Sequence, residues 1–174
     1  MLKIVATVAI AISGSAGCTT SYEYRIPSMP VSIKFGDWGV WNTFGVSGYG
    51  IYRYFILYSH GGESVREPAG FNYIQGSATG YGGVLLIGGM NPFTSDTNVP
   101  LAYDLSCPVE CSPVIRVAVN PTNLEAECPK CHSTYNVTEM GGAATSGPAV
   151  AEKYKLRFYQ CVPIPDGGYL IINQ

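Results

Sequence analysis

The sequence predicts an all-β protein that folds as an antiparallel sandwich or small barrel. Turn-forming and strand-forming residues are both frequent, with 21 Gly, 12 Pro and 13 Tyr in 174 residues. No segment carries a sustained apolar period of 3.6 residues, which argues against long amphipathic helices. A chain of this length buries one core rather than two, so we expect a single domain over residues 31–174.

Short apolar or alternating runs, separated by turn residues, are predicted to form the strands. The run 31–35 alternates, as expected for a strand with one face buried, and 51–58 is rich in Tyr and Ile. The run 82–87 (GGVLLI) is apolar throughout, which suits a strand buried on both faces. The remaining predicted strands are 100–105, 114–119, 124–127, 154–161 and 168–173. Short strands with turn signals between them are typical of sandwiches and small barrels.

The first 17 residues have the pattern of a signal peptide. A positive start at Lys3 precedes the apolar run Ile4–Ile12, which is far shorter than the roughly 20 residues of a spanning helix. The small residues that follow end at Cys18 and resemble the lipobox of bacterial lipoproteins. The resemblance implies a lipid on Cys18, a tether over 18–30 and a place in the bacterial cell envelope, periplasmic or at the outer-membrane surface. Ordinary secretion with cleavage near Ala16 is the alternative.

Composition narrows the class of partner and of activity. The net charge is −2 and only 13% of the residues are charged, so the chain lacks the basic field that binds nucleic acid. Two histidines, without a nucleophile elbow or paired carboxylates at helical spacing, give no hydrolase or transferase constellation. We therefore expect a binding protein or electron carrier, not an enzyme.

Two cysteine pairs are the clearest chemical signal. Cys107 and Cys111 form the first pair, Cys128 and Cys131 the second, and each pair begins with Cys-Pro. A thiolate metal site is built when two rigid turns bring their sulfurs together, and the strand pair 114–119 and 124–127 would set that separation. Cys161 lies in an alternating strand and is expected to be a buried small hydrophobe.

A series of further motifs accompanies these cysteines. In chain order they are Cys107-Pro108, Cys128-Pro129, 133–137 (STYNV), Gly141-Gly142, 146–149 (SGPA), 156–159 (LRFY) and 167–170 (GGYL). From about residue 101 to the C-terminus this order resembles the Rieske [2Fe–2S] domain, and most closely the Rieske-fold lipoproteins of anaerobic Gram-negative bacteria. The resemblance implies a Rieske-like fold with a two-loop cysteine tip, a cysteine-loop subdomain over about 101–149, and a Gly147-Pro148 loop that covers the cluster.

The chain departs from that family at both ligand histidines. Val109 stands where the first histidine is expected, and Cys131 where the second is expected. His132 lies one place too late to take the ligand role. Only Cys107 and Cys128 therefore match family ligands, so we expect an all-cysteine [2Fe–2S] cluster whose thiolates give a low potential suited to electron transfer with a redox protein partner. The predicted ligands are Cys107, Cys111, Cys128 and Cys131, with Lys130 and His132 adjusting the charge at the exposed edge.

Three different chemistries stay open on the same residues. Four cysteines can hold zinc in a structural site. In an oxidising compartment they can instead form two disulfides, in one of three pairings, and leave a metal-free binding or structural module. Finally, "CPKCH" at 128–132 matches a c-type haem attachment motif, with His132 as axial ligand and Met140 as the distal one.

Overall fold

A computed structural model describes residues 24–60, 63–92 and 94–173 of the protein. The predicted signal peptide, Cys18 and the beginning of the predicted tether lie outside the described residues. Within the described part, none of the helices combines the length and the apolar character that crossing a membrane requires.

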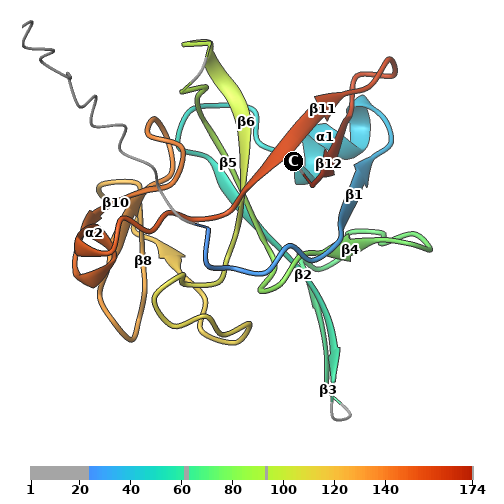
Figure 1. Cartoon of the computed structure of the whole chain (residues 1–174). Coiled ribbons are helices and arrows are strands. Elements are labelled where there is room, and N and C mark those ends of the chain that lie inside the picture. The colour runs from blue at the N-terminus through green and yellow to red at the C-terminus, as the bar shows by residue number, and fades with distance from the viewer. Residues whose placement is uncertain (1–23, 61–62, 93, 174) are drawn as a thin grey trace, which may run out of the picture.

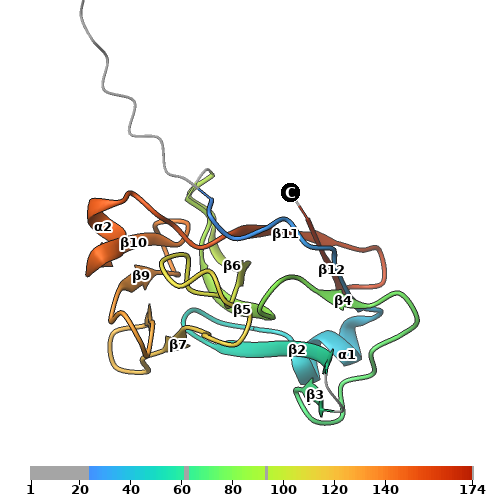
Figure 2. The ribbon, with the colours of Figure 1, turned by 60° about the horizontal axis from the view of Figure 1, so that its bottom comes forward.

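The body of the protein is a curled antiparallel sheet that forms a half-barrel (Figures 1 and 2). In spatial order its strands are β3 (Glu63–Glu67), β2 (Tyr52–His60), β5 (Val84–Met90), β6 (Thr97–Asp104), β11 (Phe158–Pro163), β12 (Tyr169–Ile172), β1 (Val31–Phe35) and β4 (Ala78–Thr79). The curl brings β4 back to β2, where the Leu57 amide donates to Thr79 Oγ1 at 3.1 Å. The predicted all-β sandwich or small barrel is confirmed.

A second, smaller sheet lies at one end of the half-barrel (Figure 1). Its strands, in spatial order, are β10 (Ala143–Ser146), β9 (Thr134–Asn136), β8 (Glu125–Glu127) and β7 (Ala118–Val119). An isolated bridge joins Ala143 of β10 to Lys155, and a second pairs Ser106 with Arg116, two residues before β7. The second of the two predicted cysteine loops lies within this sheet, between β8 and β9, whereas the first follows β6 of the half-barrel.

Strand β5 lies between two apolar cores. Leu85 and Ile87 belong to the core that faces the small sheet, which we call the first core, whereas Val84 and Leu86 belong to the second core on the other face. All four side chains are fully buried. The expectation that 82–87 is buried on both faces is therefore confirmed. The run is apolar throughout because each face of β5 packs in an apolar core.

Several elements differ from the sequence-based expectation: β3, β9 and β10 were not among the predicted strands, and β11 begins at Phe158 rather than at residue 154. Two further differences have a clear local cause. Residues Trp38–Phe44 form helix α1, whose first turn is capped by Asp37 as it accepts the Val40 amide at 3.0 Å. The predicted strand 114–119 is reduced to Ala118–Val119. The reason is that residues 115–117 bond to the chain that follows β6: the Val117 amide donates to Leu105, and Ile115 accepts from Cys107.

Candidate metal centre

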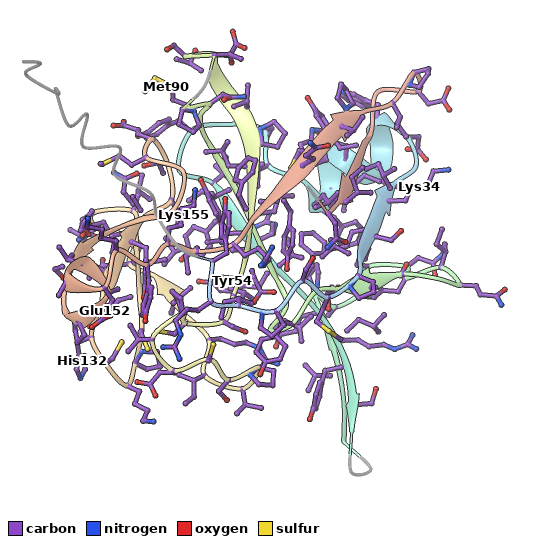
Figure 3. All side chains as sticks on the ribbon, viewed as in Figure 1. Lys34, Tyr54, Met90, His132, Glu152 and Lys155 are labelled. Atoms are coloured by element: carbon purple, nitrogen blue, oxygen red, sulfur yellow. The ribbon has the colours of Figure 1, made fainter. Side chains whose placement is uncertain are left out.

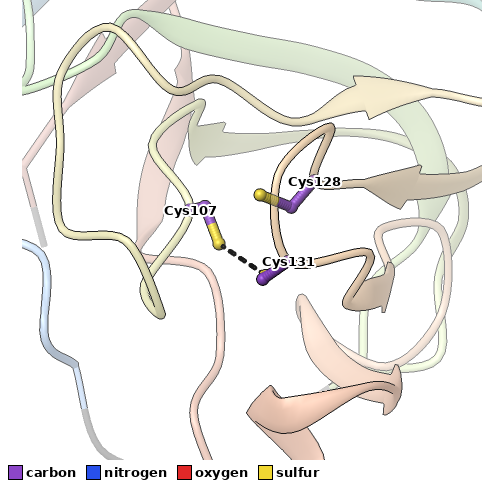
Figure 4. Close-up of side chains that lie close together, drawn as sticks. All are labelled: Cys107, Cys128 and Cys131. Carbon is purple, nitrogen blue, oxygen red and sulfur yellow. Dashed lines mark hydrogen bonds between the residues drawn. The ribbon is translucent and has the colours of Figure 1, made fainter.

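Two short loops face each other where the half-barrel meets the small sheet (Figure 4). Loop 1, residues 107–111, follows β6, and loop 2, residues 128–132, joins β8 to β9. The Sγ atoms of Cys107, Cys128 and Cys131 all lie within 4.8 Å of one another. The Sγ atoms of Cys107 and Cys131 are 3.6 Å apart. Cys107 and Cys128 are fully buried, and Cys131 is partly buried.

The two loops share one backbone turn. In each, proline follows the first cysteine, and the amide of the fifth residue donates to the carbonyl of the first: Cys111 to Cys107 at 2.9 Å, and His132 to Cys128 at 3.0 Å. The fifth residue is left-handed in both, with φ of 50° at Cys111 and 56° at His132. Side chains at equivalent places in the two loops therefore leave the backbone in equivalent directions.

This shared turn decides which cysteines meet. Cys111 occupies the fifth place, and its Sγ donates to the Arg25 carbonyl at 3.3 Å instead of joining the other three sulfurs. His132, in the same place of loop 2, turns outward to Glu127, with 3.2 Å between Nδ1 and Oε1. The structure thus brings together three of the four predicted cysteine ligands and leaves Cys111 outside the group.

Two hydroxyl groups that the sequence analysis did not single out touch the thiols. The Cys131 Sγ lies 3.3 Å from Ser133 Oγ, and the Cys107 Sγ lies 3.5 Å from the Tyr135 hydroxyl. Their signal in the sequence is their spacing, because Ser133 directly precedes strand β9 (Thr134–Asn136) and lies two residues before Tyr135 within it. Both hydroxyls can donate to thiolates and stabilise them.

The surroundings of Cys107 and Cys131 shift the pKa values of the two thiols in opposite directions. Burial raises the pKa of Cys107 to about 12, although the Tyr135 hydroxyl and the amides of Glu110 and Val109 act to lower it. Burial also acts to raise the pKa of Cys131, but hydrogen bonds from Ser133 and from the neighbouring thiols outweigh it and lower this pKa. A metal ion would therefore have to displace a proton from Cys107.

The predicted neighbours of the ligands lie around these loops. Gly147 packs so closely that a Cβ there would lie 2.7 Å from Ser133 Cα, and its φ of 76° suits glycine. After Pro148, the first residue of the short helix α2 (Pro148–Ala151), the Ala149 amide donates to Ser133 Oγ at 3.2 Å. The Gly147-Pro148 segment thus rests on loop 2.

Lys130 and His132 lie at the exposed edge of loop 2, with 64% and 73% of their side chains exposed. Figure 3 shows His132 at the periphery of the small-sheet end. The Lys130 ammonium reaches across to loop 1 and lies 2.5 Å from Glu110 Oε2. This ion pair links the two loops.

Cys161 lies apart from this centre. It pairs with Ile171 in the register of β11 and β12 and packs against the second core. Burial raises its pKa to about 12. The five cysteines of the described residues are all free thiols.

Comparison with known proteins adds no relative: no family model, no curated protein and no solved structure matches the chain. The Rieske resemblance accordingly stays a prediction. Fold and site together define an all-β protein with a group of three cysteines, two of them fully buried, that could hold a metal ion.

Proposed function

We propose that the protein binds one zinc ion through Cys107, Cys128 and Cys131. The observation that carries this proposal is the 3.6 Å separation of the Cys107 and Cys131 sulfurs, with Cys128 in the same group. With Zn–S bonds of about 2.3 Å, tetrahedral geometry places neighbouring sulfurs about 3.8 Å apart. The thiols are therefore spaced as ligands of a single ion.

The ion would join two parts of the fold. Cys107 follows a strand of the half-barrel, whereas Cys128 and Cys131 lie in the loop between two strands of the small sheet, β8 and β9. Cys107 and Cys128 are members of the first core. An ion held by both loops would thus fix the small sheet on the half-barrel, and its binding free energy would contribute to folding. We assign the ion a structural role on this ground.

An all-cysteine iron–sulfur cluster for electron transfer is the second candidate. The hydroxyl contacts of Tyr135 and Ser133 favour it, because hydrogen bonds to sulfur tune the potentials of such clusters. A redox partner would then dock at the exposed edge formed by Lys130 and His132. A two-iron cluster, however, spreads four ligands over both irons, and the three converging thiols suit one ion better.

A disulfide and a covalent haem both fit the geometry less well. A Cys107–Cys131 disulfide would require the sulfurs to close from 3.6 Å to about 2.0 Å. A covalent haem would require the thiols of Cys128 and Cys131 to bond to a porphyrin, yet both belong to the group that includes Cys107, and Cys128 is fully buried. His132, the expected axial ligand, turns to Glu127.

Metal analysis of the full-length protein tests the proposal. We expect about one zinc per chain, and loss of that zinc in Cys107→Ser, Cys128→Ser and Cys131→Ser. Cys161→Ala is the matched control and should keep its metal, since Cys161 lies outside the group. Iron with labile sulfide would establish the second candidate instead. Absence of metal together with a mapped Cys107–Cys131 disulfide would reject both.

We further propose that the protein is a lipoprotein of the bacterial envelope, anchored in the membrane through a lipid on Cys18. The support is the apolar run that ends in small residues and a cysteine. In a bacterial host, Cys18→Ala should abolish incorporation of a labelled fatty acid and release the protein from the membrane fraction. Unchanged labelling of that variant would overturn the proposal.

A further inference from the structure

Three thiolates leave a tetrahedral zinc ion one ligand short. The two side chains that the sequence offers most obviously, Cys111 and His132, sit at the outward fifth place of their loops and contact Arg25 and Glu127. In a closed structural site the fourth donor is also a protein side chain, which would then come from another position near loops 1 and 2.

The shared turn identifies that position. In loop 2 the inward-facing ligands are the first and fourth residues, Cys128 and Cys131. In loop 1 the first residue is Cys107 and the fourth is Glu110. Because the two turns have matching hydrogen bonds and a matching left-handed fifth residue, Glu110 holds the place that Cys131 holds across the gap.

Contacts of Glu110 are consistent with a donor aimed between the loops. Its side chain is only 13% exposed, although a carboxylate is costly to bury without a partner. Its amide hydrogen-bonds the Cys107 sulfur, and its Oε2 lies 2.5 Å from Lys130 of the facing loop.

From this geometry we infer that the Glu110 carboxylate is the fourth ligand of the ion, which completes a Cys3Glu site. The inference rests on the proposed zinc function. The Glu110 carboxylate lies outside the group of three sulfurs within 4.8 Å of one another, so its side chain would have to rotate on metal binding. One carboxylate oxygen would then bind the ion while the other keeps Lys130, in the way that ligating carboxylates are commonly hydrogen-bonded. Lys130 would then also offset part of the excess negative charge of four anionic donors around a divalent ion.

The composition of the site bears on which metal it selects. Zinc accepts a mixture of thiolate and carboxylate ligands, whereas iron–sulfur clusters are held mainly by thiolates. A carboxylate in the fourth place therefore favours zinc over a cluster.

The test uses the full-length protein, reduced and loaded with Zn²⁺ or with Co²⁺ as a spectroscopic probe. Chelator competition should show that Glu110→Gln weakens Zn²⁺ binding at least tenfold, and Glu152→Gln, which changes an exposed acid at the end of α2, should leave it unchanged. Lys130→Ala removes the same ion pair but no ligand, so it should weaken binding less than Glu110→Gln does. Equal losses in these two variants would mean that Glu110 acts only through Lys130 and would overturn the inference.

A gain-of-ligand variant gives a second, independent readout. In Glu110→Cys the Co²⁺ complex should gain intensity in its sulfur-to-cobalt charge-transfer band, because a fourth thiolate replaces an oxygen donor. No gain in Glu110→Cys, or a loss of this band in Cys111→Ala, would place the fourth ligand elsewhere. Failure of the wild-type protein to bind either metal would instead reject the proposed zinc function itself, so the two failures are distinguishable.

Discussion

The Oγ of Ser133 lies 3.3 Å from the Sγ of Cys131, and the same Oγ accepts the Ala149 amide at 3.2 Å. One hydroxyl therefore connects the most exposed thiol of the centre to helix α2. When Cys131 is a thiolate, the Ser133 hydroxyl can donate to its sulfur. This hydrogen bond is a main reason why the pKa of Cys131 is lowered, although burial acts to raise it.

Ser133→Ala should raise the pKa of Cys131. Burial acts to raise this pKa, and the variant removes the largest effect that opposes it. In metal-free protein, the pH midpoint for alkylation of Cys131, followed by peptide mass spectrometry, should move upward. Ser146→Ala, which removes an exposed hydroxyl that contacts Thr134, is the matched control. An unchanged midpoint in Ser133→Ala would contradict the assigned role.

Removal of the metal should loosen one end of the protein more than the other. The ion would hold loop 1 to loop 2 through cysteines of the first core. Strands β1 and β12, which pair with each other, instead place their buried side chains in the second core. With a strong chelator, hydrogen exchange should accelerate in β7 to β10 and change little in β1 and β12. A uniform acceleration of exchange through both sheets would mean that the ion does not stabilise the small-sheet end in particular.

Tyr159→Phe should lower the free energy of unfolding by about 1–3 kcal/mol. The Tyr159 hydroxyl donates to Asp104 Oδ2 at 2.6 Å, and both residues are buried. Tyr169→Phe is a suitable control, because its ring still packs on Trp41. Urea titration at neutral pH measures both variants, and equal stability of the two would show that the buried bond contributes nothing.

The same tyrosine predicts a pH dependence of stability. Burial, followed by the Asp104 carboxylate, raises the pKa of Tyr159 above its ordinary value. The folded state therefore keeps the phenol protonated while the unfolded state loses its proton above about pH 10. The stabilisation is complete below that pH and falls as the pH rises beyond it. The stability difference between wild type and Tyr159→Phe should accordingly shrink above about pH 10 in urea titrations.

Gly82→Ala should destabilise the fold by about 1–3 kcal/mol because the new methyl group has no space. A Cβ at Gly82 would lie 2.0 Å from Ser106 Oγ and 2.9 Å from the Ser106 amide nitrogen. Gly36→Ala is the matched control, since a Cβ there meets nothing within 4 Å. Thermal unfolding of the two variants compares them, and a normal melting temperature for Gly82→Ala would be incompatible with this packing.

Sequence patterns were sufficient for much of the sheet. The alternating run 31–35 matches β1 residue for residue, and the apolar run 82–87 marks the strand buried on both faces. Helix α1 was missed because seven residues are too few to show a helical period, although Asp37 before it is a common capping residue. Residues 114–117 alternate like a strand, but hydrogen bonds to Leu105 and Cys107 place them outside the small sheet.

For the centre, the sequence by itself determined that there are two Cys-Pro turns with closely spaced cysteines, because proline and the spacing of the cysteines are local properties of the chain. Only the tertiary structure decided which side chains meet. The fifth residue of each turn is left-handed, and the Cys111 thiol contacts the Arg25 carbonyl, so Cys111 lies outside the group of three sulfurs. The spacing of the cysteines in the sequence cannot reveal which sulfurs come together, since this depends on one backbone angle and on how the two loops face each other.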